Sequence, residues 1–309
     1  MYFLMLFLAI IGGSCFAIQG PINTALGKRI SVFQASFISF LGGSIISLII
    51  LIFFGDGDFS KYSNLKSWQL IGGLYGLINV CAIIAAFPVL GAALALTTIM
   101  LGQLIAGIFI DSFGFFDSPI LQVSPLRIVG IATVALGIIL IYLGSNKKNE
   151  NSSSSNNLKR FLMLLFRFAG GVFGAMQSPT NASMAKVIGN WEGTFISFLV
   201  GVFALIPISL FANKGRIMPM KGVGLKPWML IGGAFGVGGI FFSIYTVGTL
   251  GTAIQVACYM IGQLTCGLLF DTFGLIQTEK VKINLLRVVG IFTIVLGVFL
   301  VTLEKLYTV

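Results

Sequence analysis

The stretch Gln19-Gly20-Pro21-Ile22-Asn23 decides the fold, together with its copy Gln177-Ser178-Pro179-Thr180-Asn181 later in the chain. Each copy ends the first apolar segment of one half of the sequence. A proline deep in a run long enough to cross a membrane interrupts a helix where lipid would otherwise exclude loose backbone. Interrupted segments at matching positions of two halves point to the binding site of a transporter. The pattern predicts a duplicated membrane protein whose helices break at Pro21 and Pro179.

The composition indicates that most of the protein surface faces lipid. The chain of 309 residues is 57% hydrophobic and 9% charged, and its mean hydropathy is +1.03. A soluble domain carries about 25% charged residues, so this chain has too few charges to cover a surface exposed to water. The net charge of +10 comes from residues between apolar segments rather than from one patch. We therefore expect the lipid bilayer as a partner and no nucleic acid.

Residue types that carry out catalysis or bind metals are scarce. The sequence has no His, the commonest metal ligand and general base. Its four cysteines lie inside apolar segments without metal-binding spacing, which is typical of small packing residues. They are Cys15, Cys81, Cys258 and Cys266. We expect no catalytic residue, no metal site, no cofactor and no enzymatic activity.

Ten apolar segments are long enough to cross a membrane, which takes about 20 residues each. They are Tyr2–Gln19, Val32–Phe54, Trp68–Phe87, Gly91–Ile110, Ser124–Leu143, Phe161–Gln177, Gly193–Ala212, Trp228–Gly248, Gly251–Phe270 and Asn284–Leu303. The polar, Ser-rich and Asn-rich stretch Ser145–Arg160 is typical of a flexible linker. The chain therefore divides into a first five-helix repeat (1–144), a linker (145–160) and a second five-helix repeat (161–309).

The two halves match segment by segment, which indicates an internal duplication rather than a chance motif. The matched stretches are Phe37–Leu41 with Phe195–Leu199, Ile71–Gly73 with Ile231–Gly233, Gly102–Leu104 with Gly262–Leu264, and Leu126-Arg127 with Leu286-Arg287. Glycines four residues apart, as at Gly72 and Gly76, are typical of close helix contacts in membranes.

An odd number of segments in each half predicts that the second half enters the membrane from the opposite side. Lys and Arg gather on the face that holds the first, third, fifth, seventh and ninth connections, and they are sparse on the other face. The residues on the richer face are Lys28, Arg29, Lys147, Lys148, Lys159, Arg160, Lys214, Arg216, Lys221, Lys226, Lys280, Lys282 and Arg287. Because positive residues stay cytoplasmic, we expect a cytoplasmic linker and both termini outside.

Paired amides are the first candidates for substrate binding. Gln19 and Asn23 are four residues apart, as are Gln177 and Asn181, so each pair shares one face if the helix continues through the break. Amides donate and accept hydrogen bonds, so they can bind a polar substrate or satisfy backbone groups freed by the prolines. Both interpretations stay open.

Two further amides, Gln103 and Gln263, lie near the middle of their segments. An amide at this depth needs a partner within the helix bundle or a wet cavity. The alternatives are therefore substrate binding and a hydrogen bond between helices.

Acidic residues near the membrane are candidate proton carriers for a coupled transporter. Asp111 and Asp271 end equivalent segments, and each can also be a solvated helix end. Glu192 opens the seventh segment where the first half has Gln34, and it is either a coupling acid or a surface carboxylate.

The arginines near the segment ends have structural interpretations. Arg127 and Arg287 begin the segments after the acids and can pair with Asp111 and Asp271 across short loops. Arg167 lies less than two turns inside the sixth segment, and a long side chain there can reach back to the cytoplasmic face.

The solute itself is only weakly constrained by the sequence. Tyr75, Tyr245 and Tyr259 are candidates to line an aromatic cavity for an organic cation. The scarcity of charge inside the segments favours a neutral or lipophilic cationic solute.

Two motifs carry a resemblance to a known family. They are the Gln-x-Pro-x-Asn motifs and the motif Gly-Gln-Leu-x-x-Gly-x-x-x-Asp-x-Phe-Gly, found at 102–114 and 262–274. With five-helix halves in tandem, the chain resembles the drug/metabolite transporter superfamily and, within it, the YdcZ-like branch of inner-membrane exporters. The resemblance implies an all-α bundle of ten transmembrane helices in two inverted repeats, with a central cavity, in the bacterial plasma membrane.

We therefore expect a secondary transporter that exports small organic solutes by alternating access. Its partner is a small-molecule substrate, with a proton as a candidate coupling ion, and it acts as a monomer or a homodimer. The alternatives are a membrane subunit or small-molecule sensor that does not transport, and a channel. Pro21 and Pro179 are the expected gates.

Overall fold

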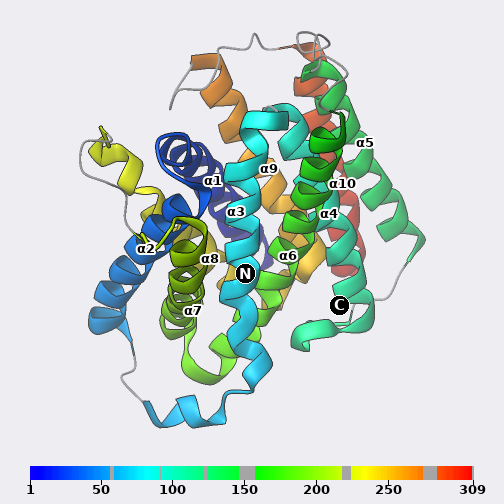
Figure 1. The fold of residues 1–309 in the computed structure, drawn as a ribbon. Coiled ribbons are helices and arrows are strands. Elements are labelled where there is room, and N and C mark those ends of the chain that lie inside the picture. The colour runs from blue at the N-terminus through cyan, green and yellow to red at the C-terminus, as the bar shows by residue number, and fades with distance from the viewer. Residues whose placement is uncertain are drawn as a thin grey trace.

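The structure, a computed structural model, describes residues 1–55, 59–90, 92–120, 124–145, 157–217, 224–273 and 284–307, and its regular elements within these ranges are all helical (Figure 1). The α-helices are α1 (Tyr2–Gly27), α2 (Val32–Phe54), α3 (Gly72–Leu90), α4 (Ala92–Phe113), α5 (Pro125–Ser145), α6 (Asn157–Ile188), α7 (Asn190–Ala212), α8 (Gly232–Leu250), α9 (Thr252–Phe273) and α10 (Leu285–Tyr307). The 3₁₀ turns are η1 (Phe59–Asn64), η2 (Ser67–Ile71), η3 (Phe115–Asp117) and η5 (Pro227–Leu230). The predicted all-α fold is confirmed.

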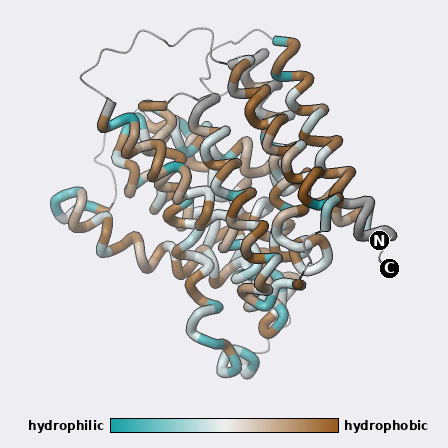
Figure 2. The backbone as a smooth tube through the Cα atoms, turned by 90° about the vertical axis from the view of Figure 1, so that its right-hand side faces the viewer, coloured by the Kyte–Doolittle hydropathy of each residue, from teal (hydrophilic) through white to brown (hydrophobic). Residues whose placement is uncertain are grey.

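Helix length and hydropathy define a multi-pass membrane protein. Seven helical stretches of the described chain are long and apolar enough to cross a membrane, and α5 and α10 contain shorter apolar stretches. Figure 2 shows that hydrophobic residues run along most of the helices, whereas hydrophilic residues gather at turns and helix ends. Large apolar side chains such as Phe53 and Phe211 are 76% and 94% exposed on the outside of the bundle, where lipid would cover them.

The helices do not end at the two central prolines, and this expectation was wrong. α1 continues through Pro21 to Gly27, and α6 continues through Pro179 to Ile188. A proline removes one backbone donor, and in a membrane bundle neighbouring helices support the helix across that gap. Gly20 also lacks the Cβ that would crowd the proline ring. Each proline therefore lies inside a long helix rather than in a loop.

The end of the expected linker is also helical. α5 extends to Ser145 and α6 begins at Asn157, so residues 157–160 belong to a helix rather than to the linker. Leu, Lys and Arg have high helix propensity, and Asn is favoured at helix ends. An Asn followed by Leu and two basic residues can therefore start a helix. The remaining part of the expected linker, 146–156, lies outside the described residues.

Each half of the chain packs on the other half in the same way. α1 packs on α8 and α9 of the second half, and the equivalent α6 packs on α3 and α4 of the first half. α2 contacts its equivalent α7, α4 contacts α9, and α5 contacts α10. Exchanging the two halves therefore maps the main helix contacts onto one another.

The contact between α5 and α10 shows the relative direction of the halves. Gly130 lies against Val301, Gly137 against Ile294, and Gly144 against Arg287. Residue numbers rise along one helix while they fall along the other, so these equivalent helices are antiparallel. A Cβ on Gly137 would lie 2.6 Å from the carbonyl oxygen of Gly290, so glycine is required for this close approach.

Two apolar clusters hold the bundle together. One joins α1, α4, α5, α9 and α10 around residues such as Met100 and Ile294. The other joins α2, α3, α7 and α8, and contains the edge-on pair Phe40 and Phe198, whose ring centroids are 5.4 Å apart. The candidate site lies where α1 and α6 pass between these clusters.

Candidate substrate cavity

The two asparagines of the central motifs hold helices together. Asn23 donates from Nδ2 to Ser39 Oγ at 3.0 Å, and its equivalent Asn181 donates to Ser197 Oγ, also at 3.0 Å. The side-chain oxygen of Asn23 lies against Gly232, the first residue of α8, where a Cβ would be only 2.2 Å away. Such oxygens meet the positive end of a helix, which favours a packing role. Neither asparagine lines the cavity.

The two glutamines of the same motifs do line a cavity. Gln19 packs against Gly236 and Gln177 against Gly76, where a Cβ would lie 2.6 Å and 2.3 Å from the respective Nε2 atoms. The small residue on the facing helix makes room for each amide. One turn of helix therefore separates a structural asparagine from a glutamine that faces the cavity.

The cavity lies between the two halves and is lined by α1, α2, α3, α4, α6, α7, α8 and α9. Gln103 and Gln263 line it, and so does Pro21 but not Pro179. Most of the remaining wall is apolar, and its aromatic residues are Phe16, Phe40, Phe87, Phe198 and Phe270. The predicted tyrosine-lined cavity was wrong, since Tyr259 instead donates a hydrogen bond to the carbonyl of Gly239 at 2.7 Å.

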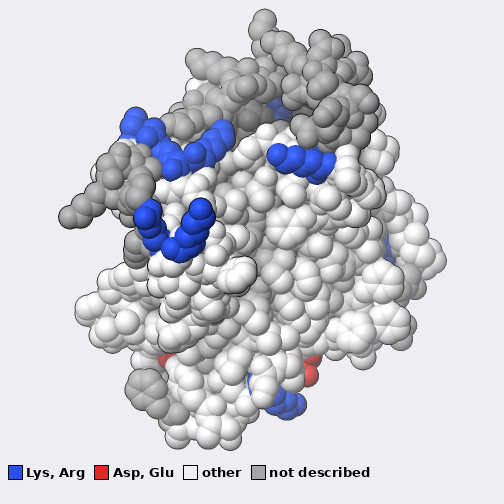
Figure 3. Space-filling model, viewed as in Figure 1, with Lys and Arg blue, Asp and Glu red and all other residues white. Residues whose placement is uncertain are grey.

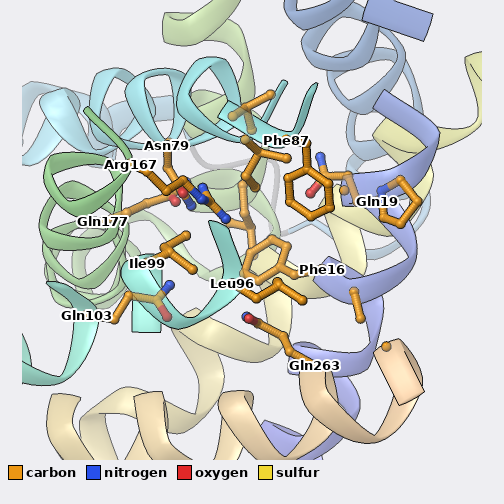
Figure 4. Close-up of a pocket in the computed structure, with 18 of the residues that line it drawn as sticks. Phe16, Gln19, Asn79, Phe87, Leu96, Ile99, Gln103, Arg167, Gln177 and Gln263 are labelled. Atoms are coloured by element: carbon orange, nitrogen blue, oxygen red, sulfur yellow. The ribbon is translucent and has the colours of Figure 1, made fainter. Parts of the chain in front are cut away.

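Polar groups collect on one wall of the cavity. Figure 4 shows Arg167 beside Asn79 and Gln177, whereas Gln19 and Gln263 lie on other walls. Gly174 of α6 makes room for this group, because a Cβ there would lie 3.0 Å from Asn79 Nδ2. Asn79 is not among the residues predicted from the sequence. Its position in the middle of an apolar segment, aligned with Gly239 in the second half, is the signal that identifies it.

Arg167 does not reach the cytoplasmic surface. Its side chain is 1% exposed and lines the cavity, and Nε donates to the carbonyl oxygen of Ala95 at 3.1 Å. The expectation of a side chain directed back to the interface was wrong, because the glycines of α6 pack its neighbouring face tightly against α3 and α4. Examples are Gly170 against Ala82 and Gly171 against the carbonyl of Ile99.

The first candidate coupling acid is tied into the fold. Asp111 is fully buried and forms an ion pair with Arg127 at 2.9 Å. It also accepts hydrogen bonds from the backbone of Thr252 at 2.7 Å and of Ala253 at 2.9 Å, the first residues of α9. The carboxylate thus stabilises a helix N-terminus. The predicted pairing with Arg127 is confirmed, and the alternative of a solvated helix end was wrong.

The other two candidate acids are Glu192 and Asp271. Glu192 is 5% exposed, so it is not the surface carboxylate considered from the sequence. Its oxygens lie beside Gly55 and Gly189, outside the cavity. The Asp271 side chain lies outside the described residues. Neither Asp111 nor Glu192 therefore faces a solute in the cavity.

The cavity extends toward one end of the bundle only. Leu96, near the start of α4, and Phe270, near the end of α9, both line it. Their equivalents in the other repeat, Val256 and Ile110, are 5% and 3% exposed and belong to an apolar cluster. The open end carries the start of α6 and the end of α3, at the top of Figure 1. The two repeats therefore differ in conformation around the cavity.

Two equivalent glycines show the same difference. A Cβ on Gly107 would lie 3.1 Å from Ala253 Cα, so α4 and α9 are closely packed there. A Cβ on Gly267, which lines the cavity, would meet no described atom within 4 Å. Around α4 and α9, one end of the bundle is closed and the other is open.

The helical bundle, with seven described stretches long and apolar enough to cross a membrane and a cavity between its halves, is that of a multi-pass membrane protein. The family model described as "Putative inner membrane exporter, YdcZ" matches residues 4–140 and again residues 162–300. The chain therefore belongs to the YdcZ family of inner-membrane exporters, in the drug/metabolite transporter superfamily, and the resemblance noted from the motifs is confirmed.

Other comparisons bear on the fold alone. A crystal structure described only as that of a protein has a TM-score of 0.67 and 14% sequence identity, and the match covers 96% of each chain. At this identity the likeness concerns the fold and not the function. No curated protein matches the sequence.

Proposed function

We propose that this protein is a secondary transporter that exports small organic solutes by alternating access. The observation that carries the proposal is the cavity, because it is built from equivalent residues of both halves. These are Gln19 with Gln177, Gln103 with Gln263, and Phe40 with Phe198. A largely apolar cavity with a few placed amides suits a small organic molecule. A site between inverted repeats can face either side of the membrane when one repeat rocks against the other.

The difference between the repeats supports this mechanism. In two inverted repeats, the opposite conformation arises when each half adopts the conformation of the other. Leu96 and Phe270 would then pack as Val256 and Ile110 do here, and the cavity would extend toward the opposite end. In this proposal the present structure would be one of the two conformations.

The open end of the cavity is proposed to face the cytoplasm. Figure 3 shows Lys and Arg gathered toward the upper end of this face of the molecule, with few at the lower end. Arg29, for example, donates to the carbonyl of Gly224 at that upper end, between the α1–α2 and α7–η5 connections. Because positive residues are retained in the cytoplasm, the linker would be cytoplasmic and both termini outside. A solute would enter from the cytoplasm and leave by the closed end.

The prolines are proposed as bending points rather than loop breaks. Each lacks the backbone hydrogen bond to the residue four positions earlier, so α1 and α6 can bend there at lower cost than elsewhere. Pro21 lines the open part of the cavity. Its equivalent, Pro179, follows Ser178, which accepts a hydrogen bond from Ser243 in the closed part. Bending at one site and straightening at the other would exchange the open and closed ends.

Flux in liposomes tests the proposal. Solutes that stabilise the purified protein against heat would be loaded into proteoliposomes, and saturable efflux that accelerates when the same solute is present outside is expected. The double variant Gln103→Ala/Gln263→Ala should lose at least about tenfold in flux, because each lost hydrogen bond to a bound solute costs about 1 kcal/mol or more. Gln255→Ala is the control, since Gln255 is buried but bonds to Ser243 outside the cavity. Flux without saturation or exchange would indicate a channel, and binding without flux would indicate a sensor or subunit.

A further inference from the structure

Arg167 is the charged group among the described lining residues of the cavity, and its charge is incompletely satisfied. Its hydrogen bond to the Ala95 carbonyl uses Nε, whereas Nη1 is buried and has no hydrogen-bond partner in the described structure. A guanidinium carries five N–H donors and stays protonated in proteins. Arg167 therefore lines the cavity while part of its guanidinium has no partner among the described residues.

No described carboxylate neutralises Arg167. Of the acids with described side chains, Asp111 pairs with Arg127 and Asp117 accepts a hydrogen bond from Ser183. Glu192 lies beside Gly55 and Gly189. A charge inside the membrane is costly, and such residues are usually retained for binding or transport. The absence of a counter-charge among the described side chains is the observation that points to a ligand.

The polar wall around Arg167 has no counterpart in the other repeat. The residues aligned with Arg167 and Asn79 are Ala9 and Gly239. Asn79 Oδ1 and Gln103 Oε1 are likewise buried without hydrogen-bond partners in the described structure. A packing feature inherited by both halves would recur in both. The charged wall occurs in one half only, so one side of the cavity is polar. A solute bound here would have a fixed orientation.

We propose that the cavity binds organic anions, with a carboxylate or phosphate group paired to Arg167 and an apolar body against the phenylalanines. Guanidinium groups bind both kinds of oxyanion through paired N–H donors. The amides of Asn79 and Gln177 lie beside Arg167 (Figure 4) and can donate or accept for a polar substituent. The inference names the substrate class of the proposed transporter, and so rests on the proposed function. It replaces the neutral or cationic solute expected from the sequence.

Matched ligands test the proposal on the full-length protein in an uncharged detergent without added anionic lipid. The probes share one ring and differ in charge: benzoate, phenyl phosphate, benzamide and benzylamine. We expect at least one of the two anions to raise the melting temperature in a saturable manner, and benzamide and benzylamine to leave it unchanged. Comparing benzoate with phenyl phosphate separates a carboxylate site from a phosphate site.

Variants of Arg167 separate ligand binding from a structural role. In Arg167→Gln the shift produced by the anion should disappear, whereas Arg167→Lys should retain part of it. Without ligand, Arg167→Gln should melt at the same temperature as the parent or higher, because an uncompensated buried charge has been removed. Arg160→Gln, on the same helix but outside the cavity, is the control and should keep the full shift.

Several results would overturn the inference. These are equal stabilisation by benzamide, preference for benzylamine, silence of both anions, or an unchanged anion shift in Arg167→Gln. A lower melting temperature of unliganded Arg167→Gln would show that Arg167 is structural. The proposed function fails separately: an anion that binds through Arg167 but shows no liposome flux would leave the inference standing and remove transport. Flux of only neutral or cationic solutes would support transport and overturn the inference that the cavity binds anions.

Discussion

Two arginines inside this bundle differ in how their charge is balanced. Arg127 is neutralised by Asp111, and that pair also supports the start of α9. Arg167 has a backbone carbonyl as its hydrogen-bond partner and faces the cavity. A buried ion pair contributes to a unique packing arrangement, whereas an unbalanced charge beside a cavity favours a ligand of opposite charge. The same residue type thus has a structural role in one place and a proposed binding role in the other.

The Asp111 pair leads to a stability prediction. Asp111→Asn should lower the free energy of unfolding by about 3 kcal/mol, because it leaves the buried Arg127 without its counter-ion. It also places an amide donor against the backbone N–H groups of Thr252 and Ala253. Denaturant titration of the purified protein, followed by circular dichroism, measures the change.

An exposed acid provides the matched control for this prediction. Asp117 is exposed and accepts a hydrogen bond from Ser183, so Asp117→Asn should cost less than about 1 kcal/mol. Full stability of Asp111→Asn together with loss of proton-coupled flux would contradict the structural role. It would restore Asp111 as a coupling acid.

Residue roles were the part least accessible to the sequence. The duplicated motifs identified Gln19, Gln103, Gln177 and Gln263, all of which line the cavity. The same motifs could not separate these glutamines from Asn23 and Asn181, because helical spacing shows that residues share a face but not what that face meets. Asn79 and Arg167 are polar in one repeat and have small equivalents in the other. Comparing the repeats for such differences would have selected both residues.

At the scale of single helices, the central prolines test the proposed bending. Pro21→Ala and Pro179→Ala each restore a backbone donor and should stiffen α1 and α6. We expect each variant to fold with a melting temperature equal to or above that of the parent, and to lose at least about tenfold in the rate of solute exchange. Exchange across proteoliposomes measures the rate. Unchanged exchange in both variants would remove the prolines from the mechanism.

The contact between α5 and α10 gives a second prediction for helices. Gly137→Ala should destabilise the protein by about 1–3 kcal/mol, because the new Cβ would lie 2.6 Å from both the Gly290 carbonyl oxygen and Ile294. Gly248→Ala in α8 is the control, since an added Cβ would meet no described atom within 4 Å, and it should be neutral or slightly stabilising. Thermal melting compares the two. Equal melting temperatures would mean that the α5–α10 contact is looser than described.

The positions of the helices were predictable, and their ends were less so. Length and hydropathy place a helix over each of the ten predicted segments, since a membrane requires backbone hydrogen bonds within the segment. The continuation of α1 and α6 past the prolines was not predictable, because it depends on packing against helices from the other half. The same holds for the start of α6 within the expected linker.

At the scale of the whole molecule, duplication explains both the symmetry and the way it is broken. Equivalent helices make equivalent contacts across the halves, yet the cavity reaches only one end of the bundle. The repeat was visible in the sequence, because matched motifs extend along both halves. The conformational difference was not, because matched motifs in the two halves do not show which conformation each half adopts. That difference is the basis of the proposed transport cycle.

Sided labelling of two equivalent positions tests this cycle most directly. Single cysteines would replace Leu96, which lines the cavity, and Val256, its buried equivalent, in a protein whose four native cysteines are changed to alanine. A membrane-impermeant thiol reagent would be applied separately to the two faces of oriented vesicles, with and without a transported solute. The account predicts that Leu96→Cys reacts only from the linker face and Val256→Cys only from the opposite face. Adding the transported solute should raise the labelling rate of one of these two cysteines and lower that of the other. Reaction of either cysteine from both faces at once, or a Val256→Cys that stays unreactive while solute is transported, would contradict alternating access between the two repeats.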